Sequence, residues 1–232
     1  MRKTAVVLSL ILACAVAIAL SGCKDTGGPD GQTGAAAAGS GPIRIAKMGG
    51  GIDVENAPLG ASLTTMGGNI QLNNVASFAK VKTMGGNIAI DHANASIDAT
   101  TMGGTIAIDN ANGSIKATSM GGGITVRVVG SSSSPRDIDL TTMAGGVQLT
   151  VPRDFPMNVR INLAYTKDSA GKYRIVDDVG LTQSQTTDWD LLDGSPRKYI
   201  RASGVVGSGL NHVTINAING NVVLKQENQP PD

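Results

Sequence analysis

The chain has 232 residues, of which 31 are Gly and only six are aromatic (three Tyr, two Phe and one Trp). Because Phe, Tyr and Trp usually contribute much of a globular core, this composition excludes an aromatic-rich core and leaves Val, Ile, Leu, Met and Ala to form it. The hydrophobic content of 41% argues against a wholly disordered chain. The formal net charge of +1 argues against nucleic-acid binding.

Residues 1–22 have the features of a segment that is removed during processing. Arg2 and Lys3 form a positive start, and the apolar run from Ala5 to Leu20 is too short and wrongly flanked for a membrane span. The run ends in Leu20-Ser21-Gly22-Cys23, which resembles the lipobox of bacterial lipoproteins. That resemblance implies cleavage before Cys23 and a covalent lipid on this residue. The alternative is an ordinary secretory signal with a free Cys23.

Cleavage at this point has consequences for cysteine chemistry and location. Cys14 would leave with the signal, so Cys23 would be the only Cys and no internal disulfide is expected. Lys24 follows it, and by resemblance to the sorting pattern of enterobacterial lipoproteins this residue favours the outer membrane. Residues 23–42 are then the lipidated Cys and a Gly/Ala-rich tether. We expect a lipid-anchored protein of the bacterial envelope, facing either the periplasm or the surface.

An 18-residue repeat organises residues 43–151. Each copy contains Met-Gly-Gly or, in the sixth, Met-Ala-Gly-Gly. The six methionines are Met48, Met66, Met84, Met102, Met120 and Met143. The last interval is longer because Gly130–Pro135 is a loop insertion, and a seventh copy without Met is Ile218–Asn221.

Apolar and polar residues alternate on both sides of each triplet, as at Ile52 and Val54. This period of two is typical of β-strands, and copies that repeat in register stack on one another. We therefore predict an all-β fold, a parallel single-stranded β-solenoid of about seven coils. Residues 210–225 are the predicted final coil, and residues 226–232 form a polar tail.

Two columns of the repeat flank the predicted turns. We predict that the methionines fill the interior beside the turn, because Met is adaptable filler. A Cu(I)-binding stripe is the alternative, since thioethers are soft ligands, but the last coil has Ile218 at this position. No metal site is therefore expected. The second column is predicted to form an outward ladder; its members are Thr65, Thr83, Thr101, Ser119 and Thr142.

The repeat resembles the DUF4097/DUF2807 family of bacterial envelope proteins, which are described as adhesins. The resemblance covers about residues 43–225 and rests on recurring units such as Gly51-Ile52-Asp53-Val54 and Asn69-Ile70-Gln71-Leu72, and on the closing Ile218-Asn219-Gly220. It implies a β-strand repeat with a function in adhesion.

Residues 152–209 break the repeat. Alternation over Met157–Tyr165 predicts a longer strand, Lys167–Gly171 a turn, and Lys172–Val176 a strand that pairs back on the first. Lys198–Ala202 is predicted to re-enter the solenoid. Because the open end of a solenoid must be covered, we interpret this irregular strand segment as a capping insertion before the last coil.

The same segment holds the candidate binding residues. They are Tyr165, Tyr173, Trp189 and Tyr199, with Asp177, Asp178, Asp188 and Asp190. Either the aromatic side chains pack as part of the cap, or they line a binding surface beside the carboxylates.

Three functional hypotheses remain open. The first is a non-enzymatic lipid-anchored protein that presents a solenoid for adhesion, for contact with envelope proteins or glycans, or as a spacer. The second is a carbohydrate-binding or polysaccharide-cleaving β-helix that uses residues 152–209. The third is an accessory or sensing protein of the envelope. The pair Asp91 and Asp109 shares a column at a spacing like that of glycosidase carboxylates, but a solvated ladder is favoured, so no catalytic residue and no cofactor are expected.

Overall fold

The computed structural model describes residues 41–94, 96–130, 134–191 and 196–227. The predicted signal peptide, Cys23 and nearly all of the tether lie outside these residues, as does the tail beyond residue 227. In the part of the chain that is described, no helix has the length and apolar character needed to cross a membrane.

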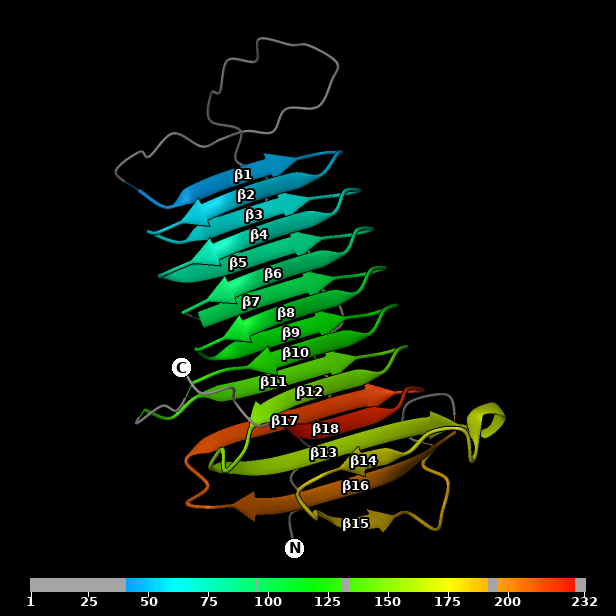
Figure 1. Ribbon diagram of the computed structural model, residues 1–232. Coiled ribbons are helices and arrows are strands. Elements are labelled where there is room, and N and C mark those ends of the chain that lie inside the picture. Colours follow the sequence, from blue (N-terminus) through cyan, green and yellow to red (C-terminus); the bar gives the residue numbers. More distant parts are fainter. Residues whose placement is uncertain (1–40, 95, 131–133, 192–195, 228–232) are drawn as a thin grey trace, which may run out of the picture. The chain divides into compact units, whose positions relative to one another are not determined.

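Two sheets form the fold, and the chain passes from one to the other in most turns (Figure 1). In spatial order, the first sheet consists of β1 (Ile43–Lys47), β3 (Ala61–Thr65), β5 (Phe78–Thr83), β7 (Ser96–Thr101), β9 (Ile115–Ser119), β11 (Asp137–Thr142), β17 (Asn211–Ile218), β13 (Met157–Thr166), β16 (Arg197–Val206) and β15 (Thr182–Gln185). The second consists of β14 (Ile175–Asp177), β18 (Val222–Glu227), β12 (Val147–Pro152), β10 (Ile124–Val128), β8 (Ile106–Ala111), β6 (Ile88–Ala93), β4 (Ile70–Val75) and β2 (Ile52–Ala57).

The repeat produces a parallel solenoid, as predicted. Equivalent residues of successive copies pair in register, for example Ile70 with Ile88 and Ile88 with Ile106. The alternating apolar side chains of both sheets point inward and form one buried aliphatic cluster. The aliphatic side chains of one coil therefore continue those of the next.

The order of the coils in space differs from their order along the chain. The coil β17–β18 packs directly on β11–β12, and β13–β14 packs on the other side of β17–β18 (Figure 1). The predicted final coil is therefore followed in space by one more parallel layer, which precedes it in sequence. The 152–209 segment covers the solenoid from beyond this coil.

Two predictions about strand pairing in this segment are wrong. Ile175–Asp177 does not pair back on Met157–Thr166; it pairs in parallel with β18 in the opposite sheet. Lys198–Ala202 does not re-enter the solenoid either, because β16 is the antiparallel partner of β13. The short helix η1 (Lys167–Ser169) begins the passage between the sheets, so residues 167–174 act as one more solenoid turn instead of a hairpin.

The turn columns are also reversed relative to the prediction. The Thr/Ser column is buried, with each member at most 3% exposed, whereas Met66 is 45% and Met102 42% exposed. The cause is strand alternation: Ala61, Leu63 and Thr65 share the inner face of β3, so the next residue, Met66, points outward. The methionines are not core filler.

The buried hydroxyls hold successive turns together. Thr101 Oγ1 donates to Gly86 O at 2.8 Å in the preceding coil and accepts from Gly104 N at 3.1 Å in its own turn. A Cβ at Gly86 would overlap the backbone carbonyl of Gly68, whereas a Cβ at Gly85 would have its nearest neighbour, Met66 O, at 3.8 Å. The second Gly of the triplet is therefore required by the contact between coils.

Candidate functional site

The candidate binding residues of the 152–209 segment fall on two sides of β16. The pairing of Tyr165 with Lys198 and of Leu163 with Ile200 turns Lys198 and Ile200 toward the core side of the sheet. Tyr199 lies between them and points to the opposite face. The structure therefore does not gather the four aromatic side chains into one surface.

Tyr165 and Trp189 form the centre of a cluster on the core side, where the cap meets the solenoid. Tyr165 is only 5% exposed, and its ring meets the half-buried ring of Trp189 edge-on with centroids 6.1 Å apart. The ammonium groups of Lys167 and Lys198 lie 5.6 and 5.0 Å from the Trp189 ring centroid. Gln185 Nε2 donates to the Tyr165 hydroxyl. The cluster is thus held by packing and by cation–π contacts.

Two carboxylates of the predicted site, those of Asp177 and Asp178, serve the fold. Asp177 accepts hydrogen bonds from the backbone N–H of Leu181 at 2.8 Å and from Gln183 Nε2 at 3.0 Å. Asp178 accepts from the backbone N–H of Gln226 at 3.2 Å, which ties the cap to β18. Asp188 accepts from its neighbour Thr187, and the backbone of Asp190 bridges to Arg197.

The two remaining tyrosines are separated from this cluster. Tyr173 is half-buried against the aliphatic core. Tyr199 is half-buried on the other face of β16, with the Arg201 guanidinium 5.3 Å from its ring centroid. Of these two rings, that of Tyr199 is therefore partly covered by a cation of the protein itself.

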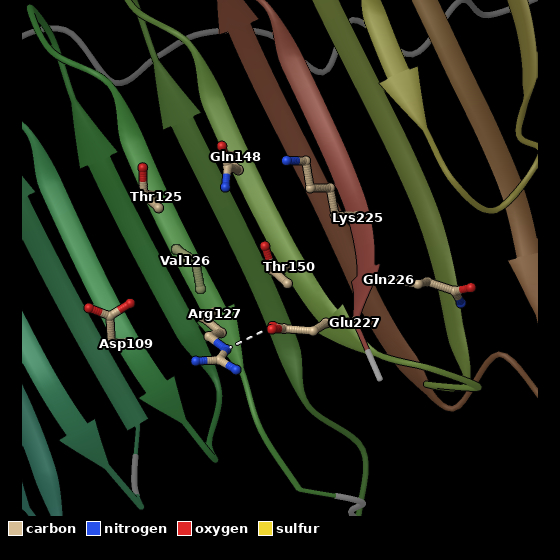
Figure 2. A pocket seen from close by; sticks show the side chains of 9 residues that line it. All are labelled: Asp109, Thr125, Val126, Arg127, Gln148, Thr150, Lys225, Gln226 and Glu227. Carbon is tan, nitrogen blue, oxygen red and sulfur yellow. Dashed lines mark ion pairs between the residues drawn. The ribbon is translucent and has the colours of Figure 1, made fainter. Parts of the chain in front are cut away.

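A polar hollow lies on the outer face of the second sheet, over β8, β10, β12 and β18 (Figure 2). Its volume is about 430 Å³, and its lining residues are Asp109, Thr125, Val126, Arg127, Gln148, Thr150, Lys225, Gln226 and Glu227. Arg127 Nε and Glu227 Oε2 form an ion pair at 2.9 Å across this surface. Arg127 pairs with Thr150, and Thr150 with Lys225, so the groups come from adjacent strands.

Arg127 and Lys225 were not singled out from the sequence, although a signal for them exists. Each lies seven residues after the first residue of its turn triplet, in the column that also holds Asp91 and Asp109. Along the stack this column therefore changes from acidic to basic. Asp91 is half-exposed and Asp109 is exposed, which agrees with a solvated ladder.

A buried polar junction was also not predicted from the sequence. Asn211 is fully buried, where β11, β17 and β13 begin side by side. Its Nδ2 donates to Pro156 O at 2.7 Å, and its Oδ1 accepts from Arg136 N at 3.0 Å. The Arg136 guanidinium donates to Val129 O at 3.2 Å and to Asn112, and desolvation by burial lowers the pKa of this group below its ordinary value.

Comparison with known proteins adds no relative: no family model matches the chain, and neither a curated protein nor a solved structure matches it significantly. Within the described ranges, no group of three or more His, Cys, Asp or Glu side chains is placed to hold a metal ion.

Proposed function

We propose that the chain is a non-enzymatic, lipid-anchored envelope protein whose β-solenoid presents a fixed polar surface to other envelope proteins. The observation that carries this proposal is the outward column on the second sheet, which changes from Asp91 and Asp109 to Arg127 and Lys225. Successive strands of this sheet lie about 4.8 Å apart, and the register shifts by one residue at Arg127, between Val126 and Val128. Charges fixed in this way favour a partner surface of complementary charge.

The lipid anchor supplies the location in this proposal. The sequence Leu20-Ser21-Gly22-Cys23 has the lipobox pattern, and more than one acyl chain on Cys23 would give durable membrane attachment. The tether would then hold the solenoid near the membrane surface. The resemblance to the DUF4097/DUF2807 family points in the same direction.

The anchor is tested with the variant Cys23→Ala. We expect the native chain in the membrane fraction and the variant in the soluble fraction, with acyl groups on the amino-terminal Cys23 peptide of the native protein by mass spectrometry. Lys24→Asp is the control for sorting, because it preserves the lipidation site. If Cys23→Ala stays in the membrane fraction, the lipid anchor is wrong.

The contact surface is tested by photo-crosslinking in the native envelope. A photoreactive residue at Thr125 or Gln148, which line the hollow, is expected to capture a protein partner. The same group at Lys80, on the outer side of the other sheet, is the control. The charge reversal Arg127→Glu should reduce capture from Thr125 and Gln148. Equal capture from all three positions would contradict a specific surface.

Carbohydrate binding by the cap is the second candidate, and the half-buried Trp189 with two nearby ammonium groups favours an acidic glycan. Its weakness is that Lys167 and Lys198 already lie near the Trp189 ring, so a sugar would have to displace them to stack there. Binding of acidic polysaccharide that disappears in Trp189→Ala but persists in Arg127→Glu would favour this candidate over protein contact.

A further inference from the structure

The six methionines of the repeat form a line of exposed thioether side chains, here called the methionine ladder. Their exposed fractions run from 38% at Met143 to 76% at Met48. Met157, in contrast, is fully buried in β13. The ladder therefore contains every described methionine except one, and it places them on the turn edge of the solenoid.

Packing does not explain why Met recurs at this position. In the five turns from Met66 to Met143 the inward position is filled by Thr or Ser, and the contact between coils requires the second Gly. The coil β17–β18 accepts Ile218 in place of Met. Six exposed apolar side chains on neighbouring turns carry a hydration cost, so a property of the thioether itself is the better explanation.

The coils bring successive rungs of the ladder side by side. The residues before Met66, Met84 and Met102 pair in register as Thr65, Thr83 and Thr101. Backbone bonds continue this contact into the turns, from Gly85 N to Met66 O at 3.2 Å and from Gly103 N to Met84 O at 2.9 Å.

The loop insertion does not interrupt the ladder. Met143 N donates to Ser119 O at 3.1 Å, as Met120 N donates to Thr101 O at 3.2 Å in the preceding coil. Met143 thus follows Met120 in space despite the longer interval in sequence. All six rungs belong to consecutive coils.

This spacing suits a soft monovalent metal ion. Strands in a sheet are about 4.8 Å apart. A metal–sulfur bond of the length found between zinc and cysteine, about 2.3 Å, would separate two sulfurs on opposite sides of one ion by about 4.6 Å. Thioethers select Cu(I) over hard cations, and the three rotatable bonds of Met allow each sulfur to adjust.

We propose that the methionine ladder binds Cu(I) between the thioethers of neighbouring coils. Sequence considerations disfavoured copper because the methionines were expected in the core and because the last coil has Ile218 at this position. The exposure of the methionines removes the first objection. Ile218 lies in the coil after Met143, so it does not interrupt the six consecutive rungs. Two adjacent rungs form one two-coordinate site, so six rungs accommodate about three ions. The proposal is independent of the protein-contact surface on the second sheet.

Binding can be followed residue by residue with Ag(I), which has the same charge and softness and undergoes no redox change in the assay. The full-length protein in detergent is labelled with ¹³C at the methionine methyl groups and titrated with Ag(I). The methyl signals of the ladder are expected to shift, and the signal of buried Met157 to stay in place. Ladder signals that do not move in excess Ag(I) would overturn the proposal.

The role of adjacency is tested by two triple variants that each retain three ladder methionines. Met48→Leu/Met120→Leu/Met143→Leu leaves three consecutive rungs, whereas Met66→Leu/Met102→Leu/Met143→Leu leaves three alternate rungs. With Cu(I) supplied anaerobically as its bicinchoninate complex, the consecutive variant should bind at least tenfold more tightly. Circular dichroism checks that both retain the fold.

A six-Leu ladder variant separates thioether binding from binding elsewhere in the chain, including any remaining Cys thiol, which it leaves unchanged. We expect it to take up about three fewer equivalents of Cu(I) than the native protein. Met157→Leu is the control and should take up as much as the native protein. Equal affinity of the two triple variants, or undiminished uptake by the six-Leu variant, would refute a site between coils.

Discussion

Residues 43–151 and residues 152–209 hold their strands together in different ways. In the repeat, each strand pairs with the equivalent strand of the next copy, and the same inward aliphatic and hydroxyl side chains recur. In the cap, β13 pairs with strands from two later parts of the chain, β16 and β17. The cap is held by contacts that each occur only once, such as the contact between the rings of Tyr165 and Trp189.

This difference predicts how each region responds to substitution. A change at one position of the repeat affects a contact that recurs along the stack, and the neighbouring coils cannot adjust without losing register. A change in the cap affects a contact that occurs once. The largest losses of stability are therefore expected at the turns, intermediate losses at the junction and the smallest in the cap.

The largest effect is expected for Gly86→Ala. The new methyl group would overlap the carbonyl of Gly68 and force two coils apart, at a cost of about 3 kcal/mol or more in the free energy of unfolding. The control is Gly85→Ala in the same triplet, which meets no atom closer than 3.8 Å and should change stability by less than about 0.5 kcal/mol. Urea unfolding measures both, and similar losses would contradict the close approach at Gly86.

An intermediate effect is expected for Asn211→Ala at the junction between repeat and cap. The substitution removes the acceptor for Arg136 N and a donor to Pro156 O in a fully buried place, which should cost about 2 kcal/mol. His212→Ala is the control because His212 is the exposed neighbour. If the two variants unfold at the same urea concentration, the amide does not hold the junction.

The smallest effect is expected for Trp189→Ala in the cap. Loss of the half-buried ring removes its contacts with Tyr165, Lys167 and Lys198 and should cost about 1 kcal/mol. Amide hydrogen exchange should accelerate in β15 and β16 and stay unchanged in β5–β10. Trp189→Phe keeps an aromatic ring and should exchange more slowly than Trp189→Ala. Faster exchange throughout the repeat would show that the cap does not open independently.

The sequence alone predicts the solenoid because the constant repeat length determines which residues pair between neighbouring strands. Once Met48 to Met120 are aligned, columns such as Ile52, Ile70 and Ile88 predict which residues pair. The inward position of Thr65 could have been predicted as well, because it continues the alternation of Ala61 and Leu63. Met66 was wrongly predicted to point inward because the prediction used its hydrophobicity and not the alternation of the preceding strand.

The strand pairing in the cap could not be predicted in this way, for a physical reason. Its pairings depend on long-range choices between strands that have no repeated partner. Ile175 and Val176 lie in the stretch Lys172–Val176 that was predicted to be a strand, but nothing local indicates that they pair with β18 rather than β13. The same holds for Asn211, whose role depends on Arg136 and Pro156, which come from different parts of the chain.

The interior position of the coil β17–β18 has a consequence for how the chain acquires its fold. Regular coils are joined by partners 18 residues apart, such as Asn56 and Asn74, and such short closures favour fast, stepwise growth. The contact between Arg136 and Asn211 spans 75 residues. When the chain emerges amino end first, the last coil arrives after the strands on both sides of it, so the space between them has to stay open. Premature docking of β13–β14 on β11–β12 would be a kinetic trap, and the final step of folding is expected to be the slowest.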